Sequence, residues 1–354
     1  MTIPISVKRD RVGDRTVALR AGIGREIVPL IGATVVVFVA PQIGLSLRLV
    51  AEIGVLRGAP PEEFGLIQDV ATDAMGRVYV LDSRTYDLRV FDRRGKFLYT
   101  AGRNGRGPGE FYVPVAVAAD SAGTVYVLDE GNWRVSAFQA TNSALKYASS
   151  FPIDFSGSDL CLLGGRLYVL GLRDGTQVQV YSSLGERLLS FGAPYRPEHP
   201  VLNRSLSRGR IDCVGDSGII VVSLDLLPEV RAYTSDGALL WTTVLGDFRQ
   251  VTIDENTDGS ITYTAGSDRA YDVLASLLYV HPRIVLAQVG KLTSRASAAD
   301  NFQTIDTRFI SLMDGKELQA DQSLPLFRAI SPIQIYAVRN HPYPTLSMYH
   351  YTLR

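Results

Sequence analysis

A segment that occurs twice constrains this 354-residue chain more than any other feature of its sequence. Val70–Asp82, VATDAMGRVYVLD, returns as Val117–Asp129, VAADSAGTVYVLD, at an offset of 47 residues. The valine, alanine, aspartate and glycine positions and the run VYVLD recur in register. A repeat with this period is typical of stacked supersecondary units that bury a continuous core between neighbours. The chain is therefore expected to be a repeat array.

Each repeat has the pattern of four short strands. The runs VATD and VYVLD are rich in β-branched and aromatic residues, and Asp73–Gly76 between them has the composition of a tight turn. Two further runs follow at Leu88–Asp92 and Lys96–Thr100, with an Arg-Gly turn between them. These runs are shorter than typical helices, which average about 11 residues. Four antiparallel strands in such a repeat constitute one propeller blade.

The same spacing continues toward the C-terminus with less sequence identity. A third hairpin at Leu160–Leu170 has a turn one residue shorter, a fourth unit starts near Ile211, and a fifth starts at Asp272. Between the fourth and fifth units, residues 247–270 break the rhythm. The turn Thr257-Asp258-Gly259 predicts a protruding hairpin in that segment.

The two ends of the chain are expected to share one blade. The last run supplies only three strands, at Phe327–Ile330, Ile333–Val338 and Thr345–Leu353, and Ser46–Ile53 has the pattern of the missing fourth. Pairing these segments closes the ring and removes exposed sheet edges. The sequence therefore predicts an all-β fold over residues 45–354: a six-bladed β-propeller of four-stranded antiparallel blades, with the last blade closed by an N-terminal strand.

Residues 1–44 are interpreted as an N-terminal extension with a signal- or anchor-like stretch. Ile27–Leu47 contains no charged residue and follows a basic segment, Lys8–Arg25. Three interpretations stay open: the apolar region of a signal peptide, a single membrane anchor, or an extra strand or buried arm. We expect a periplasmic, secreted or membrane-tethered protein that contacts the membrane only through this stretch.

Each of the first two units is preceded by a loop of glycine and proline that ends in Glu-Phe, at Glu63-Phe64 and Glu110-Phe111. We expect the two phenylalanines to wedge between sheets and the two glutamates to cap loop amides. The only cysteines, Cys161 and Cys213, fall where the first two units have alanine. Small side chains suit crowded innermost strands, so the favoured interpretation is two buried thiols. A disulfide is the alternative, and it requires Cα atoms within about 7 Å.

The pattern VxxDxxGxVYVLD, followed by an aromatic strand and GxGPGEF, resembles the NHL-repeat and TolB-like six-bladed propellers, including bacterial proteins described as 6-bladed β-propellers. The resemblance rests on Glu63–Arg103 and Gly105–Phe138, and beyond residue 140 on spacing and glycine turns. Members of these groups include carbohydrate- and protein-binding modules, RNA binders, lactonases and amidating lyases. The resemblance therefore implies a fold without fixing a function.

Polar residues near the blade ends are the candidate ligand contacts. In an antiparallel meander, the start of each inner strand and the end of each second strand lie on one face. Mixed acids and arginines at such a funnel mouth suit a polar ligand or a cation. The alternative is that Asp82 and Asp129 cap turns and that Arg134 pairs with a neighbouring carboxylate. The candidates are Asp69, Asp159, Arg210, Asp212 and Arg328 near the axis, and Arg84, Asn132 and Arg134 further out.

Enzyme signatures are sparse. The four histidines lack metal-ligand spacing, and no P-loop or nucleophile elbow is present. Zero net charge gives no reason to expect nucleic-acid binding, so RNA recognition is only a third alternative. We expect a monomeric, non-enzymatic scaffold without a cofactor that binds a protein, peptide or glycan on its funnel face. The main alternative is a lactonase- or lyase-like hydrolase with calcium in the channel, held by Asp69, Asp159 and Asp212.

Overall fold

The computed structural model describes residues 43–58, 61–195, 203, 206–258, 260–264, 270–293, 302 and 304–354. The charge-free stretch up to residue 42, and with it the choice between signal, anchor and arm, lies outside these ranges. Within them, no helix has the length and apolar character that crossing a membrane requires.

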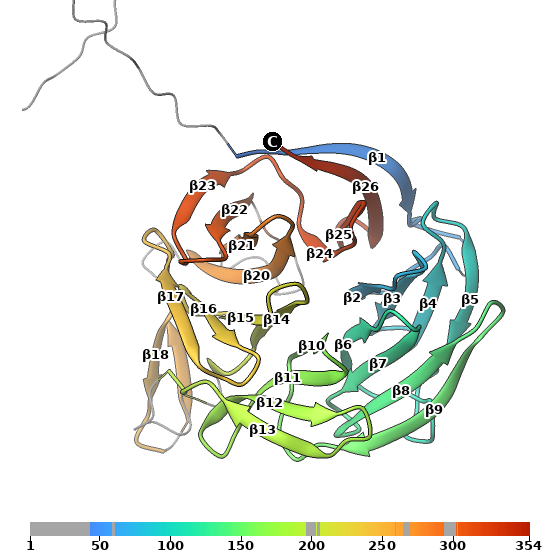
Figure 1. Ribbon diagram of the computed structural model, residues 1–354, viewed down its shortest axis with the longest axis horizontal. Coiled ribbons are helices and arrows are strands. Elements are labelled where there is room, and N and C mark those ends of the chain that lie inside the picture. Colours follow the sequence, from blue (N-terminus) through green and yellow to red (C-terminus); the bar gives the residue numbers. More distant parts are fainter. Residues whose placement is uncertain are drawn as a thin grey trace, which may run out of the picture. The chain divides into compact units, whose positions relative to one another are not determined.

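The strands form six four-stranded antiparallel sheets arranged around an axis (Figure 1). Blades 1 to 3 follow the chain in order. Blade 1 contains β2 (Ile67–Thr72), β3 (Val78–Asp82), β4 (Asp87–Phe91) and β5 (Phe97–Ala101). Blade 2 contains β6 (Pro114–Ala119), β7 (Thr124–Asp129), β8 (Arg134–Ala140) and β9 (Leu145–Pro152). Blade 3 contains β10 (Asp159–Leu163), β11 (Arg166–Arg173), β12 (Thr176–Ser182) and β13 (Arg187–Phe191).

The second half of the ring has the same plan with one insertion. Blade 4 contains β14 (Gly209–Val214), β15 (Ile219–Leu224), β16 (Glu229–Thr234) and β17 (Leu239–Val244). A separate two-stranded sheet follows, formed by β18 (Thr252–Glu255) and β19 (Ile261–Thr264), which confirms the predicted hairpin. Blade 5 contains β20 (Ala270–Val280), β21 (Ile284–Thr293), β22 (Thr304–Ser311) and β23 (Glu317–Asp321).

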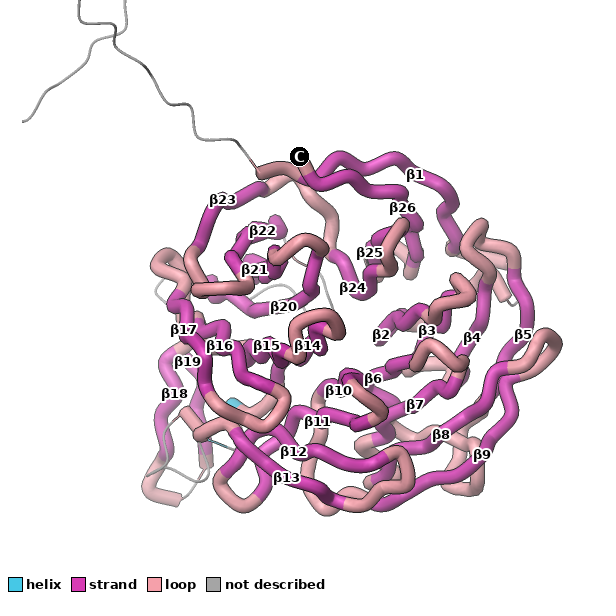
Figure 2. The backbone as a smooth tube through the Cα atoms, in the orientation of Figure 1, coloured by secondary structure: helices cyan, strands magenta, loops and turns pink. Residues whose placement is uncertain are grey.

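Blade 6 joins the two ends of the propeller. It contains β24 (Phe327–Ile330), β25 (Gln334–Arg339), β26 (Thr345–Leu353) and β1 (Leu45–Ile53). Strand β1 pairs antiparallel with β26, from Leu45 opposite Leu353 to Ile53 opposite Leu346. Each innermost strand also contacts the innermost strands of both neighbouring blades, so the ring is closed (Figure 2). The prediction of six blades, the last closed by an N-terminal strand, is confirmed.

The repeat register explains why the blades stack. Val70 lies opposite Val80 in blade 1, and Val117 lies opposite Val127 in blade 2, so equivalent residues occupy equivalent rungs. The apolar faces of adjacent blades then meet in shared clusters. Phe111, which is fully buried, packs among residues of both blades 1 and 2, with its ring centroid 5.7 Å from that of Phe138. The predicted wedge is confirmed.

Candidate ligand-binding site

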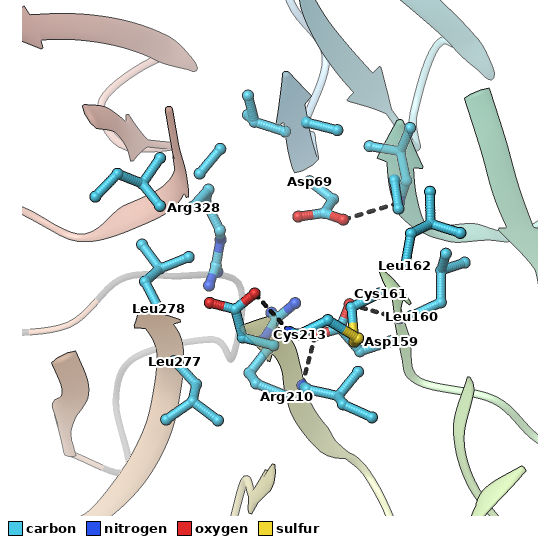
Figure 3. Close-up of a pocket in the computed structure, with 18 of the residues that line it drawn as sticks. Asp69, Asp159, Leu160, Cys161, Leu162, Arg210, Cys213, Leu277, Leu278 and Arg328 are labelled. Atoms are coloured by element: carbon cyan, nitrogen blue, oxygen red, sulfur yellow. Dashed lines mark hydrogen bonds between the residues drawn. A yellow bond between two sulfur atoms is a disulfide. The ribbon is translucent and has the colours of Figure 1, made fainter. Parts of the chain in front are cut away.

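All six innermost strands line an axial cavity of about 210 Å³ at the centre of the ring. Strands β2, β10, β14 and β24 contribute its charged side chains (Figure 3). The structure therefore brings together the five axial candidates predicted from the sequence. They are Asp69, Asp159, Arg210, Asp212 and Arg328.

The three aspartates also fasten neighbouring blades to one another. Asp69 Oδ2 accepts a hydrogen bond from the Val117 amide at 2.8 Å, which joins blades 1 and 2. Asp159 Oδ2 accepts one from the amide of Ile211 at 3.0 Å, between blades 3 and 4. Asp212 Oδ2 accepts one from Tyr279 at 2.6 Å, between blades 4 and 5. A carboxylate with strong acceptor oxygens can satisfy these buried amides where no ladder partner is available.

Other junctions use different groups. Arg328 Nη1 donates to the carbonyl of Ala275, joining blades 6 and 5. Asn340 Oδ1 accepts from the Ile67 amide at 3.1 Å while its Nδ2 donates to the Ile67 carbonyl, joining blades 6 and 1. In blade 2, Ala116 occupies the rung that Asp69 occupies in blade 1. The carboxylate clamp is therefore a property of selected junctions.

Cys161 and Cys213 form a disulfide between β10 and β14, with their Cα atoms 5.6 Å apart. The favoured sequence interpretation, two free buried thiols, is wrong. The predicted equivalence of the positions is confirmed, because Cys161 and Ala71 each lie opposite a tyrosine of the next strand, Tyr168 and Tyr79. Adjacent inner strands approach closely enough at this rung for the two sulfurs to bond. The disulfide lies in the wall of the axial cavity (Figure 3).

Burial raises the pKa values of the cavity acids. It raises the pKa of Asp159 to about 7, with a contribution from Asp69, while the guanidinium of Arg210 opposes the shift. It raises the pKa of Asp212 to about 6, against the hydrogen bonds from Tyr279 and Cys213. Burial also raises the pKa of Asp69, with Arg210 and Arg328 acting in the other direction. The net charge of the cavity therefore changes near neutral pH.

The three outer candidates lie away from the cavity: Arg84 lies in the turn between β3 and β4, Asn132 lies in the turn between β7 and β8, and Arg134 is the first residue of β8. Asn132 Nδ2 donates to Asp129 Oδ2 at 2.7 Å and to the Gly105 carbonyl at 3.0 Å. Arg134 donates to three loop carbonyls, those of Arg106, Gly107 and Glu110. Arg84 is exposed and its side chain lies against Gly65. These residues hold or border the loops that lead into blades 1 and 2.

The capping roles predicted for the repeated acids are confirmed. Asp82 accepts hydrogen bonds from the amides of Gly65, Leu66, Arg84 and Thr85. Asp129 accepts from those of Tyr112, Val113 and Asn132. Glu63 accepts from the amide of Gly58, and Glu110 accepts from that of Gly107.

A second pocket, of about 640 Å³, lies where the inner strands of blades 4, 5 and 6 end. We call it the vestibule. Its rim is built from the turns that follow β14, β20 and β24, and the last residues of β26 complete it. It shares Asp212, Cys213 and Ile330 with the axial cavity, so the two spaces have a common wall. The vestibule is lined by Asp212, Cys213, Asp216, Tyr279, His281, Pro282, Ile330, Ser331, Pro332, Tyr351 and Leu353.

The vestibule lies at the opposite end of the ring from the face expected to bind ligand. The expectation placed ligand contacts where inner strands start, whereas Asp216, His281 and Ser331 follow the ends of inner strands. Sequence reasoning missed these residues together with Tyr279 and Tyr351. Tyr351 comes from β26 of blade 6, and the packing of blade 6 against blade 5 brings it to the turn at His281-Pro282.

Two guanidinium groups, those of Arg210 and Arg328, accompany the acids of the axial cavity and disfavour a calcium ion there. Asp69, Asp159 and Asp212 each give an oxygen to a backbone amide of the next blade. In the part of the chain that the structure describes, no three His, Cys, Asp or Glu side chains come together in a way that could hold a metal. The geometry therefore lends the calcium-hydrolase alternative no support.

Comparisons with known proteins agree on the architecture. The family DUF5128, described as 6-bladed beta-propeller, matches residues 62–180. The fold is a six-bladed β-propeller. A DUF4221 family member from Bacteroides vulgatus has 8% identity and a TM-score of 0.58, over 88% of this chain and 98% of its own. No curated protein sequence matches the chain.

A candidate exported protein from Bacteroides fragilis also has the same fold, with 12% identity and a TM-score of 0.52. The alignment covers 88% of this chain and 95% of that protein. Such low identities establish the fold alone. The resemblance to six-bladed propellers is thus confirmed, while the finer assignment to the NHL-repeat and TolB-like groups stays a prediction.

Proposed function

We propose that this propeller is a non-enzymatic binding scaffold that receives part of a protein, peptide or glycan in its vestibule. The observation that carries the proposal is the shared wall of Asp212, Cys213 and Ile330. Through it, a surface pocket adjoins a polar cavity at the centre of the ring. A ligand held in the vestibule could therefore direct one small polar group toward the axis.

The size and lining of the vestibule suit this role. Ligand pockets usually measure about 300–1,000 Å³ and combine mostly apolar walls with a few polar groups. The vestibule, at about 640 Å³, has aromatic, proline and aliphatic walls, including Tyr279, Tyr351 and Leu353. The smaller axial cavity has room for little more than one side-chain-sized group.

The frame of the site favours binding because it is already ordered. Asp212 fastens blade 4 to blade 5, and the disulfide fastens blade 3 to blade 4. Walls held by such links lose little conformational freedom when a ligand binds, which increases affinity.

The described lining residues also favour binding over catalysis. The two cysteines are bonded to each other, so neither is available as a nucleophile. His281 Nδ1 lies 3.9 Å from Asp216 Oδ2, and both side chains are largely exposed. A nucleophile and its base normally lie within hydrogen-bond reach. The hydroxyl of Tyr279 lies 3.3 Å from the same nitrogen of His281, so the hydroxyl and the Asp216 carboxylate face one ring nitrogen and do not form a hydroxyl–histidine–carboxylate relay across the ring.

We infer that the protein works outside the cytoplasm. Disulfides persist in oxidising compartments and are rare in the cytosol. The likeness to a candidate exported protein points the same way. Trapping thiols with an alkylating agent in intact native cells tests this inference. Unmodified Cys161 and Cys213 are expected, whereas full alkylation of both would contradict it.

The binding proposal is tested with peptide and glycan arrays probed by labelled full-length protein. Tyr351→Ala enlarges the vestibule and removes an aromatic wall, so it should abolish specific signals. Trp133→Ala is the matched control, because Trp133 is an exposed aromatic residue in a turn of blade 2. Melting temperatures establish that both variants are folded. Signals that survive Tyr351→Ala but vanish in Trp133→Ala would contradict the proposal, because they would show that the ligand binds at the end of the ring opposite the vestibule.

A further inference from the structure

The vestibule is lined by two carboxylates, those of Asp212 and Asp216, and by one exposed histidine, His281. Asp212 lies in the wall shared with the axial cavity, and Asp216 lies at the rim with 82% of its side chain exposed. No lysine or arginine is among the described residues that line the vestibule. The axial cavity differs, because Arg210 and Arg328 accompany its acids.

Two tyrosine side chains also favour a cationic ligand in the vestibule. Tyr279 and Tyr351 both line the vestibule. They lie close enough that, after burial, the hydroxyl of Tyr279 contributes to raising the pKa of Tyr351. The faces of aromatic rings carry partial negative charge and attract cations. Aromatic walls and carboxylates therefore favour the same kind of ligand group.

We propose that the vestibule binds an organic cation, an alkylammonium or guanidinium group on an apolar stem, as in a lysine or arginine side chain. This inference rests on the proposed binding function. The stem would lie along Ile330, Leu353 and the tyrosine rings, as long cationic side chains do on apolar surfaces. The charged head would reach Asp212.

The position of Asp212 explains where the cation would stop. Its oxygens accept hydrogen bonds from the amides of Tyr279 and Cys213. An ionised carboxylate has about four acceptor sites, so the carboxylate retains capacity for a ligand. Beyond it, Arg210 and Arg328 line the axial cavity and would repel a second positive charge.

The experiment is calorimetric titration of the full chain with short acetylated and amidated peptides. The peptides contain lysine, arginine, norleucine or glutamate at one central position, flanked by glycine. Lysine and arginine peptides are expected to bind at least roughly tenfold more tightly than the norleucine peptide.

A second titration uses free butylamine, which carries the same ammonium group and apolar stem without a peptide. An affinity equal to that of the lysine peptide assigns the site to small amines, and a weaker one assigns it to peptides.

Substitutions locate the cation. Asp212→Asn keeps an acceptor for the Tyr279 amide but removes the charge, so it should weaken the lysine peptide roughly tenfold. Asp216→Asn should weaken it less, because Asp216 is exposed to solvent. Asp258→Asn is the control, since it removes one exposed negative charge from the loop between β18 and β19. It should leave affinity unchanged.

Two negative outcomes are distinguishable. If an uncharged array ligand binds in the vestibule, is lost in Tyr351→Ala and is unaffected by Asp212→Asn, the proposed function stands and the cation inference fails. If lysine peptides do not bind at millimolar concentration and no array ligand responds to Tyr351→Ala, both fail.

Discussion

The carboxylate of Asp69 accepts a 2.8 Å hydrogen bond from the amide of Val117, the residue that repeats Val70 one blade later. One unit of the repeat thus supplies the acceptor that the backbone of the next unit needs. Because both groups are buried, losing the acceptor leaves a donor without a partner.

Asp69→Ala should therefore destabilise the protein by about 1–3 kcal/mol, the usual cost of leaving one buried polar group unsatisfied. Asp69→Asn keeps an acceptor oxygen and should cost less. Urea denaturation monitored by tryptophan fluorescence measures both changes. Equal losses for the two variants would show that the carboxylate acts through its charge instead of through this hydrogen bond.

Removing the disulfide should lower stability more than any single hydrogen bond. Cys161 and Cys213 are separated by 52 positions, and closing a loop of that size restricts the unfolded chain by about 4 kcal/mol. The variant Cys161→Ser/Cys213→Ser should lose about 2–4 kcal/mol in denaturant titrations. Dithiothreitol should destabilise the wild type and have no effect on the variant. A similar effect on both would rule out the bond as its target.

The cavity acids should make the protein more stable in mild acid than above neutral pH. Their folded-state pKa values, about 7 for Asp159 and about 6 for Asp212, exceed the value of about 3.9 in an unfolded chain. The folded state therefore binds more protons between pH about 4 and 7. This stabilisation is present at low pH and is lost as pH rises through that window.

Urea midpoints between pH about 5 and 8 measure this slope. Acids with lowered pKa values, such as Glu110 and Asp314, titrate below this range and do not contribute to it. The midpoint should fall with rising pH in the wild type and vary less in Asp159→Asn/Asp212→Asn. An equally steep fall in the double variant would assign the titration to other groups.

Arg134 should matter for stability and not for ligand binding. It donates to the carbonyls of Arg106, Gly107 and Glu110, so Arg134→Ala releases the loop that leads into blade 2. A loss of about 1–3 kcal/mol is expected, together with faster proteolysis of that loop. Affinity for vestibule ligands should stay within about twofold. A large loss of affinity would contradict this prediction and would indicate that Arg134 contacts the ligand.

The sequence was informative wherever a feature repeats with the blade. The pairing of Val70 with Val80, and of Val117 with Val127, follows from the repeat offset, and so does the placement of Cys161 on an inner strand. The disulfide depends on the distance between neighbouring inner strands. Periodicity within a blade does not specify that distance.

The vestibule could not be predicted for a related reason. Tyr279 and Tyr351 belong to adjacent blades, 5 and 6, and they meet through the packing of these two blades against each other. The bonding of Arg134 was also hidden, because an arginine near Asp129 suggests an ion pair. Its actual acceptors are carbonyls of a loop more than 20 residues earlier in the chain.

A crystal structure of the full chain with the tightest peptide or glycan from the arrays tests the assigned site most directly. We predict ligand density between Tyr279 and Tyr351, with a polar group directed toward Asp212. Ligand density at the other end of the ring, beside Asn132 and Trp133, together with an empty vestibule, would contradict the assignment of the binding site to the vestibule.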